Sequence, residues 1–280
     1  MTANVRSYGR AILAVLGSAP ALFAARAMGL GVLQGVTEFL PVSSSGHLVL
    51  AEHMFGIARP GLSLEVGVHL GTLLAVAVRY RRDAARVWRD PARGFERGAQ
   101  LFCATLPAAV VGLAGGGAID ALFSSLPAVA VAWCVSGLAL VAVSRRPPGR
   151  RRLAGLRLRE ALWIGACQAI ALVPGVSRSG ATMAAGLVTG LEASQAVRFA
   201  FLLSVPAVAG AALLELPALA ALPVPSLALL GLAAAAAAVT GLWALRVCEG
   251  RVTRSGLGGY GYYCLGLGLL CLGWWFRPRA

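Results

Sequence analysis

Residues 33–47, LQGVTEFLPVSSSGH, bring a carboxylate, an amide, four hydroxyls and a histidine into an apolar part of the chain. A second stretch, residues 167–182 (CQAIALVPGVSRSGAT), matches the first at a constant offset of 134 residues, the difference between 168 and 34. Polar, glycine-containing breaks at matching places in two halves of an apolar chain predict an internal repeat and one composite site. The alignment pairs Gln34 with Gln168 and the VSSSG of residues 42–46 with the VSRSG of residues 176–180.

The composition of the whole chain indicates a membrane protein. Hydrophobic residues make up 58% of its 280 residues, charged residues only 13%, and the mean hydropathy is +0.77. Soluble domains are about one quarter charged, and several apolar runs here approach the roughly 20 residues that cross a hydrocarbon core. We therefore expect an all-α polytopic membrane protein built as a single integral membrane domain.

The positive charge follows the positive-inside pattern. All 25 basic residues are arginines, the formal net charge is +14, and two loops, residues 79–97 and 145–159, hold seven arginines each. Short arginine-rich loops between apolar runs fix the topology and favour anionic membrane lipids. The pattern places both loops, and a third segment at residues 246–254, on the cytoplasmic side. It argues against nucleic acid as the partner.

Two pairs of apolar segments are too short to cross the membrane comfortably and are separated by the polar breaks. Residues 28–40 and 46–57 form the first pair, and residues 160–173 and 179–190 form the second. Non-helical backbone at membrane depth is tolerated where protein or water satisfies it, so each pair is predicted to be a re-entrant hairpin. Full helices are expected at residues 64–78, 100–118, 126–143, 195–215, 226–246 and 260–276.

Counting crossings from the arginine-rich loops sets the orientation of the two hairpins. The first would enter from outside and the second from inside, which is an inverted-topology repeat of residues 28–143 and 160–276. We therefore predict that the two hairpin tips meet near the bilayer midplane. Residues 1–27 would add an N-terminal helix or a signal-like segment.

Glu38 is the first candidate for chemistry. It shares a helix face with Gln34, four residues earlier, and a carboxylate at membrane depth costs at least ~2.5–3.5 kcal/mol unless it is paired or lines a wet cavity. The alternative is a glutamate at the interface that points its carboxylate to water. We favour function, because Pro41 and three serines follow at once, and hydroxyls and free amides at a helix break bind oxyanions or help to hold a cation. Glu38 and Gln34 are the predicted metal ligands.

Ser44 and His47 are three residues apart and would be neighbours on a helix. Two chemistries stay open: Ser44 as a nucleophile with a base beside it, or His47 as the group that attacks or protonates the phosphate. The alternative is that one of the serines at 43–45 simply caps the helix, which leaves the histidine unexplained.

Arg178 is the only arginine between Glu160 and Glu192. A guanidinium matches phosphate oxygens bidentately and keeps its charge, and the small polar residues around it leave backbone N–H groups free at a helix start. An arginine that only sets topology is the weaker interpretation, because no other charge lies nearby. The hydroxyls expected to bind substrate are those of Ser43, Ser45, Ser177, Ser179 and Thr182.

Glu65 and His69 lie four residues apart on one predicted helix, and we expect them to support the site or to hold a metal with Glu38. The set Glu38, Ser44, His47 and Arg178 indicates phosphoryl transfer to water at a membrane-embedded site. The six cysteines lie in or beside apolar runs without metal-ligand spacing, so we expect buried hydrophobes and not disulfides or zinc ligands.

The two motifs LQGVTEFLPVSSSGH and PGVSRSGAT resemble the signature motifs of the undecaprenyl-diphosphate phosphatase family, also called bacitracin-resistance proteins. LEVGVHLGTLLAV (64–76) and FAFLLSVPAVAGA (199–211) are similar to that family as well, and the resemblance runs from about residue 28 to the C-terminus. It implies hydrolysis of undecaprenyl diphosphate to the monophosphate, which recycles the lipid carrier for peptidoglycan synthesis. It also places Glu38, Ser44, His47 and Arg178 on functional positions.

The resemblance further implies a divalent cation, Mg²⁺ or Ca²⁺, interdigitated re-entrant helices, and a site open to the outer face of the bacterial inner membrane. One departure concerns the cation: the first acid of the family's acidic motif is Gln34 here, so metal binding would rest more on Glu38. A second departure is the longer segment before residue 28. Whether two copies form a homodimer stays open.

Two rival functions explain less of the sequence. The type-2 phosphatidic-acid phosphatase class also uses SGH and SR motifs, but its site begins with a lysine, and this chain contains none. A lipid-carrier translocase would share inverted repeats and broken helices, but it needs no serine–histidine–arginine set. Transfer of the lipid carrier across the membrane stays open as an additional activity; it would move the lipid without releasing phosphate.

Overall fold

The computed structural model describes residues 20–55, 62–220 and 224–277, and nearly all of them are helical, as predicted. The first part comprises α2 (Pro20–Phe39), α3 (Ser44–Phe55), α4 (Leu62–Arg79), α5 (Arg81–Arg89), α6 (Pro91–Phe123) and α7 (Leu126–Ser144). After a short 3-10 turn, η1 (Leu153–Gly155), come α8 (Leu158–Ile170), α9 (Arg178–Val188), α10 (Ala193–Ala220), α11 (Val224–Ser255) and α12 (Gly258–Trp275).

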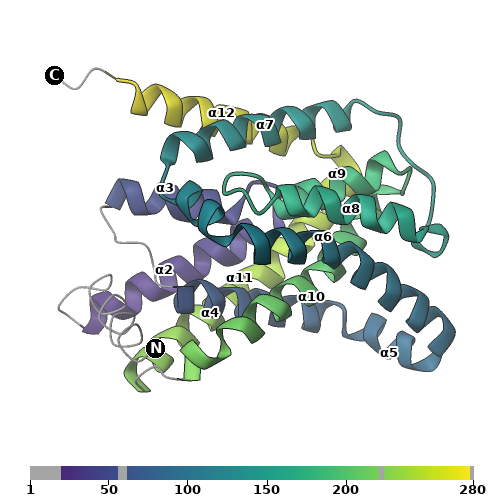
Figure 1. Cartoon of the computed structure of the whole chain (residues 1–280), viewed down its shortest axis with the longest axis horizontal. Coiled ribbons are helices and arrows are strands. Elements are labelled where there is room, and N and C mark those ends of the chain that lie inside the picture. Colours follow the sequence, from purple (N-terminus) through teal and green to yellow (C-terminus); the bar gives the residue numbers. More distant parts are fainter. Residues whose placement is uncertain (1–19, 56–61, 221–223, 278–280) are drawn as a thin grey trace.

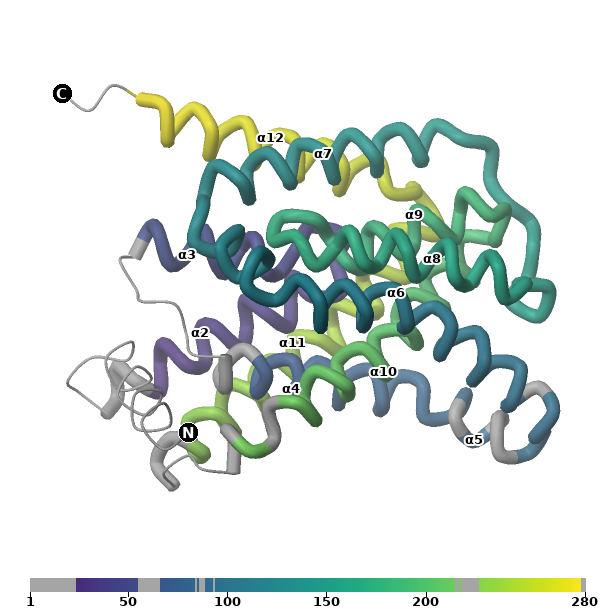
Figure 2. Tube along the Cα trace, in the orientation of Figure 1, coloured from purple at the N-terminus to yellow at the C-terminus, as the bar shows by residue number. Residues whose placement is uncertain are grey.

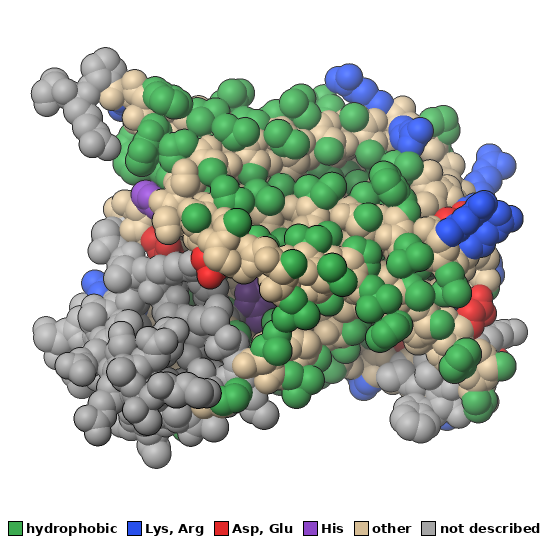
Figure 3. Space-filling model, in the orientation of Figure 1, with side chains coloured by type: hydrophobic (Ala, Val, Ile, Leu, Met, Phe, Trp, Pro, Cys, Tyr) green, Lys and Arg blue, Asp and Glu red, His purple; other side chains and the backbone are tan. Residues whose placement is uncertain are grey.

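Four described helices are long and apolar enough to span a membrane, in the stretches Gly94–Phe123, Leu126–Ser144, Ala193–Leu214 and Leu227–Ser255. Large aliphatic side chains point outward from them; Leu113 of α6, for example, is 73% exposed. In Figure 3 hydrophobic side chains cover the middle of the molecule, whereas arginines gather at the right-hand end. A helix hydrogen-bonds its own backbone N–H and C=O groups, so a helix with such an apolar surface can lie in the hydrocarbon core of a membrane. The chain is a multi-pass helical membrane protein.

Several predicted boundaries differ from the structure, and α6 and α10 end five residues later than predicted, at Phe123 and Ala220. Residues 20–27 are the beginning of α2 and not part of a separate segment, while residues 1–19 lie outside the described residues. The arginine-rich loop at 79–97 contains α5 and the first turns of α6, and α11 continues past residue 246 to Ser255. Arginine is a good helix former, so an arginine-rich segment need not break the helix.

Small residues bring α2 and α11 into close contact. A Cβ atom added to Gly31 would lie 2.2 Å from the carbonyl oxygen of Ala233, and one added to Gly35 would lie 2.5 Å from that of Ala237. Two helices pack this closely only where both carry small side chains at a spacing of four residues. This packing holds the helix that carries Glu38 against the centre of the molecule.

The helices form three layers (Figure 1). α7 and α12 make one side, α2, α4, α10 and α11 make the opposite side, and the shorter α3, α8 and α9 lie between them. Figure 2 shows α12 running alongside α7, where a Cβ atom on Gly137 would lie 2.6 Å from the carbonyl oxygen of Gly261. The short helices thus have longer helices on two sides, while α8 keeps an exposed face that carries Trp163 and Ile170.

Arg151 connects the start of α8 with the end of α9. Its guanidinium donates to both carboxylate oxygens of Glu160, at 2.8 and 3.0 Å, and to the carbonyl of Thr189 at 2.7 Å. The hydrogen bonds from Arg151 lower the pKa of Glu160 to about 2. An isolated bridge joins the backbones of Arg151 and Leu191. The chain therefore enters α8 and leaves α9 at the same end of the molecule.

Candidate active site

The turn between α2 and α3, residues 40–43, is held in one conformation by its neighbours. Ser43 adopts a left-handed backbone with φ 67°, which is uncommon for a residue other than glycine. Its hydroxyl accepts a hydrogen bond from the Gly46 N–H at 3.3 Å and caps α3. The buried indole of Trp133 in α7 donates to the carbonyl of Val42 at 2.9 Å. These contacts fix the position of the N-terminus of α3.

The turn between α8 and α9, residues 171–177, meets the first turn. Gly175 has φ 97°, and a Cβ atom there would lie 2.4 Å from the carbonyl oxygen of Val129. Ser177 caps α9 by accepting a hydrogen bond from the Gly180 N–H at 3.1 Å. The next serine, Ser179, donates its hydroxyl to the carbonyl of Leu40 at 3.1 Å. The two polar breaks of the sequence therefore lie against each other.

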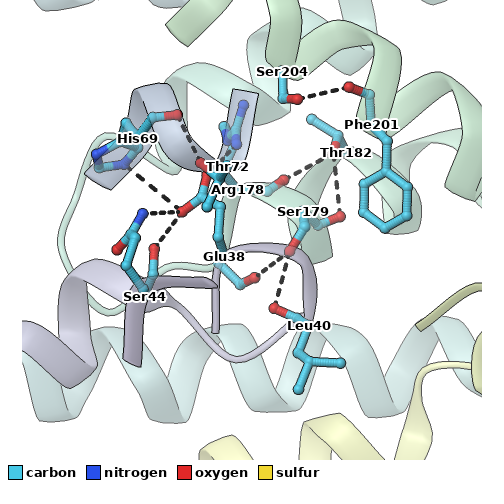
Figure 4. A network of polar contacts seen from close by, with 12 residues as sticks. Glu38, Leu40, Ser44, His69, Thr72, Arg178, Ser179, Thr182, Phe201 and Ser204 are labelled. Carbon is cyan, nitrogen blue, oxygen red and sulfur yellow. Dashed lines mark hydrogen bonds and ion pairs between the residues drawn. The ribbon is translucent and has the colours of Figure 1, made fainter. Parts of the chain in front are cut away.

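Glu38 is the centre of the polar network at this junction (Figure 4). Its carboxylate is buried, and oxygen Oε1 pairs with Nη2 of Arg178. The other oxygen, Oε2, accepts hydrogen bonds from the Ser44 hydroxyl at 2.6 Å and from Nε2 of Gln34 at 2.8 Å. Nε2 of His69 lies 3.7 Å from the same oxygen. Buried charges are retained where partners compensate them, and here the partners come from α2, α3, α4 and α9.

A cavity of about 180 Å³ opens beside this network. The N-termini of α3 and α9 both face it, and such termini attract anions because their first N–H groups have no helical partners. Arg178 lines the cavity, and its buried Nη1 has no hydrogen-bond partner within the described residues. The arrangement presents unused donors to an anion. The polar lining consists of Glu38, Ser43, Ser44, Ser45, Glu52, His69, Ser177 and Arg178.

His47 does not line this cavity. Its Nδ1 lies 2.7 Å from the carbonyl oxygen of Ser43 and must donate to it, so in the neutral ring Nε2 accepts from the Tyr263 hydroxyl, also at 2.7 Å. The ring stacks on Tyr263 and meets Trp133 edge-on. Ser44 and His47 lie three residues apart on α3, as predicted, but Ser44 donates to Glu38 and His47 bonds to Ser43 and Tyr263. The flank of α3 that carries residue 47 packs against α7 and α12, which the helical spacing could not reveal.

The other predicted residues divide between the cavity and its surroundings. Ser43, Ser45 and Ser177 line the cavity, whereas Ser179 bonds the α2–α3 turn and Thr182 donates its hydroxyl to the Arg178 carbonyl at 2.8 Å. Ser179 and Thr182 therefore hold the backbone around the cavity and do not face it.

The structure describes the side chain of Gln34 but not that of Glu65. Gln34 is fully buried behind Glu38, and its Oε1 has no hydrogen-bond partner in the described part of the chain. Glu65 falls in the first turn of α4, but its side chain lies outside the described structure.

Two residues that the sequence analysis missed shape the site. Trp133 holds the first turn, and Tyr263 turns His47 away from the cavity. An indole N–H in an apolar helix needs an acceptor, and this signal could have placed Trp133 beside a polar break. Tyr263 gave no such signal, since it is one of three tyrosines within four residues of α12.

Comparison with known proteins gives the family of the chain. Residues 27–270 match the family model for the bacitracin resistance protein BacA. The chain is 44% identical over 205 residues to an undecaprenyl-diphosphatase of Desulfosudis oleivorans, covering 66% of this chain and 74% of that protein. It is 39% identical to an undecaprenyl-diphosphatase of Geobacter sulfurreducens (84% and 92% covered) and 38% identical to one of Rubrobacter xylanophilus (88% and 96% covered). The chain belongs to the bacitracin resistance protein BacA family, the undecaprenyl-diphosphatases.

Proposed function

We propose that this protein hydrolyses undecaprenyl diphosphate to undecaprenyl phosphate and inorganic phosphate. The observation that carries the proposal is the convergence of two helix N-termini, Arg178 and the Ser44–Glu38 pair on one cavity. Helix N-termini and a guanidinium are the groups that bind phosphate oxygens. A hydroxyl hydrogen-bonded to a carboxylate is a nucleophile beside its base. The names of the relatives identify the substrate.

Ser44 is the proposed nucleophile. Its hydroxyl already donates to Glu38 Oε2 at 2.6 Å, so the proton can move to the carboxylate as the oxygen attacks the terminal phosphorus. The bond from phosphorus to the bridging oxygen breaks, and undecaprenyl phosphate leaves. Water then attacks the phosphoserine, which releases inorganic phosphate and restores Ser44. His69, close to the same carboxylate oxygen, is placed to pass protons, whereas His47 is engaged with Tyr263.

Arg178 has two tasks in this proposal. Its Nη2 pairs with Glu38, and its Nη1 has no hydrogen-bond partner among the described residues. A bound phosphate offers oxygens to Nη1 and draws positive charge away from Glu38, which makes the carboxylate a better base for Ser44. During attack the guanidinium stabilises the negative charge that grows on the phosphate oxygens.

A divalent cation, Mg²⁺ or Ca²⁺, fits the oxygen ligands available at Glu38. Both ions prefer oxygen ligands, and Mg²⁺ in particular is held by one or two carboxylates together with substrate phosphates. Within the described residues no group of three or more His, Cys, Asp or Glu side chains forms a metal site. Glu38 and Oε1 of Gln34, an oxygen without a hydrogen-bond partner in the part of the chain that the structure describes, would hold the ion. The ion would neutralise phosphate charge.

We place this site near the bilayer midplane, between two re-entrant hairpins of an inverted-topology repeat, open to the outer side of the membrane. The lengths of α3, α8 and α9, 12, 13 and 11 residues, support the second hairpin and one arm of the first, because such helices span only about 17–20 Å of a hydrocarbon core that is about 30 Å thick. The other arm, α2, has 20 residues and is longer than the predicted segment 28–40. The start of α8 and the end of α9 meet at Arg151, which also supports a hairpin there.

The test is phosphate release from undecaprenyl or farnesyl diphosphate by the purified protein with Mg²⁺ or Ca²⁺. We expect turnover by the wild type and near-complete loss in Glu38→Ala and Arg178→Ala, because phosphate charge and the base are then missing. Arg145→Ala, at an exposed position on the far loop, is the matched control and keeps full activity. Full activity in both site variants would refute the proposed site, and inactivity of the wild type would refute the proposed function.

A further inference from the structure

A second cavity, of about 880 Å³, lies between α4, α5, α6 and α10 at the arginine-rich end of the molecule. It shares no residue with the cavity around Glu38. One part of its wall is apolar, with Leu101, Leu202 and Val205, and the other part carries arginines. Its size is within the range of small-molecule and lipid sites, ~300–1,000 Å³. The cavity is therefore amphipathic and large enough for a ligand with a polar and an apolar part.

The polar wall carries an excess of positive charge. Among the described residues its arginines are Arg81, Arg89, Arg97 and Arg198 and its acidic residues are Asp83 and Asp90, which gives four positive charges against two negative ones. Arg198 donates Nη2 to Asp83 at 2.6 Å, but its buried Nε has no hydrogen-bond partner in the described ranges. Arg97 is half-buried, and its Nη1 donates to the side-chain oxygen of Gln100 at 2.7 Å, a neutral acceptor. A ligand with negative charge would balance this wall.

The positive-inside rule accounts for arginines at this end of the molecule, but not for their position beside an apolar wall inside one cavity. Basic pockets between membrane helices bind the head groups of anionic lipids. We propose that this cavity binds an anionic phospholipid, with its phosphate against Arg81 and Arg97 and its acyl chains along Leu202 and Val205. The proposal is independent of the hydrolytic reaction, because none of these residues touches the cavity at Glu38.

The experiment measures lipid binding to the full-length protein by native mass spectrometry, with dioleoyl phosphatidylglycerol and, separately, dioleoyl phosphatidylcholine. We expect the wild type to retain phosphatidylglycerol in preference to phosphatidylcholine. The double variant Arg81→Gln/Arg97→Gln should lose about tenfold or more in affinity for phosphatidylglycerol. Its affinity for phosphatidylcholine should stay unchanged. Arg145→Gln/Arg146→Gln, which removes two exposed arginines outside the cavity, is the matched control and should bind as the wild type does.

A second variant guards against misfolding of the first. Val205→Trp leaves every arginine in place but fills the apolar part of the cavity, so it should weaken binding of both lipids. Equal unfolding temperatures without lipid would show that the variants are folded. Three results would overturn the proposal: unchanged affinity in the double variant, equal binding of both lipids by the wild type, or displacement of the lipid by equimolar glycerol phosphate, which would identify a site for soluble phosphate.

Discussion

Ser44 and Arg178 occupy the same position in two related turns, each being the first residue of its helix. In the first turn this residue donates to Glu38, and in the second it forms an ion pair with the same carboxylate. Two copies of the first stretch, residues 33–47, would bury two carboxylates without a cation, and two copies of the second, residues 167–182, would bury two guanidinium groups. The difference between the turns therefore makes one compensated pair, which a buried charge requires.

The two turns also differ in how they are fixed. The first has four residues, contains Ser43 in the left-handed conformation, and accepts a hydrogen bond from the Trp133 indole. The second has seven residues and uses Gly175 for its left-handed position. The shorter turn places Ser44 and Glu38 within hydrogen-bond distance. The longer one brings an arginine across from another part of the chain.

Making the two turns alike should have the largest effect. Arg178→Ser converts the second motif to VSSSG, and we expect a loss of about 10³-fold or more in kcat/KM, because the guanidinium that balances phosphate charge is gone. The variant should also lose ~3–5 kcal/mol of stability, since Glu38 remains buried without its partner. The double variant Glu38→Gln/Arg178→Ser should regain stability but not activity; recovery of activity there would contradict the roles given to both residues.

Removing the hydroxyl that distinguishes the first turn should be nearly as severe. We expect Ser44→Ala to lose activity on the order of 10³-fold, because water would have to replace a positioned nucleophile. Ser45→Ala, which removes a hydroxyl one residue further along the same cavity wall, should lose less than about tenfold. A rapid quench with labelled diphosphate should trap label on the wild type. Equal activities of the two variants would argue for direct attack by water.

The histidines near the first turn have no counterpart at the second, where Ala181 aligns with His47. We expect His69→Gln to reduce kcat about 10²-fold, because it lies beside the Glu38 carboxylate. His47→Gln should have a smaller effect, similar to that of Tyr263→Phe, since both act on the packing of α3 against α12. The pH dependence of kcat for the two histidine variants is the measurement. A larger loss in His47→Gln would return the acid–base role to that residue.

The aligned glutamines offer a matched pair with a smaller effect. Gln34→Glu adds a second carboxylate beside Glu38, and we expect it to lower the Mg²⁺ or Ca²⁺ concentration for half-maximal activity several-fold. Gln168→Glu buries a charge next to the carbonyl of Ala104, which its amide now approaches at 3.4 Å, and should destabilise the protein by about 2–4 kcal/mol without a change in cation dependence. Identical cation titrations for Gln34→Glu and wild type would remove Gln34 from the ligand set.

The smallest expected effects compare the glycines that follow each turn. A Cβ atom at Gly46 would lie 2.7 Å from the Trp133 ring, whereas one at Gly180 would lie 3.1 Å from Cβ of Pro41. We expect Gly46→Ala to cost about 1–3 kcal/mol of unfolding free energy and Gly180→Ala less than that. Thermal unfolding of both variants in the same detergent measures the difference. The reverse order would mean that the second turn is the more tightly packed.

Much of the fold followed from the sequence. Apolar runs predicted all of the helices that the structure describes except the arginine-rich α5, because burial in lipid depends on composition over about 20 residues. The constant offset between the motifs indicated that the two polar breaks belong together. The boundaries at the arginine-rich segments were wrong, since arginine continues a helix as readily as it ends one.

The sequence by itself determined the membrane class, the family and the residue types at the site: one acid, one arginine and a set of serines. Only the tertiary structure decided which of them meet. It paired Glu38 with Arg178 across 140 residues, brought His69 to that carboxylate, and turned His47 to Tyr263. The reason is geometric. Composition and spacing are local properties, but a step of one residue turns a helical side chain by about 100°, so its direction depends on how distant helices pack.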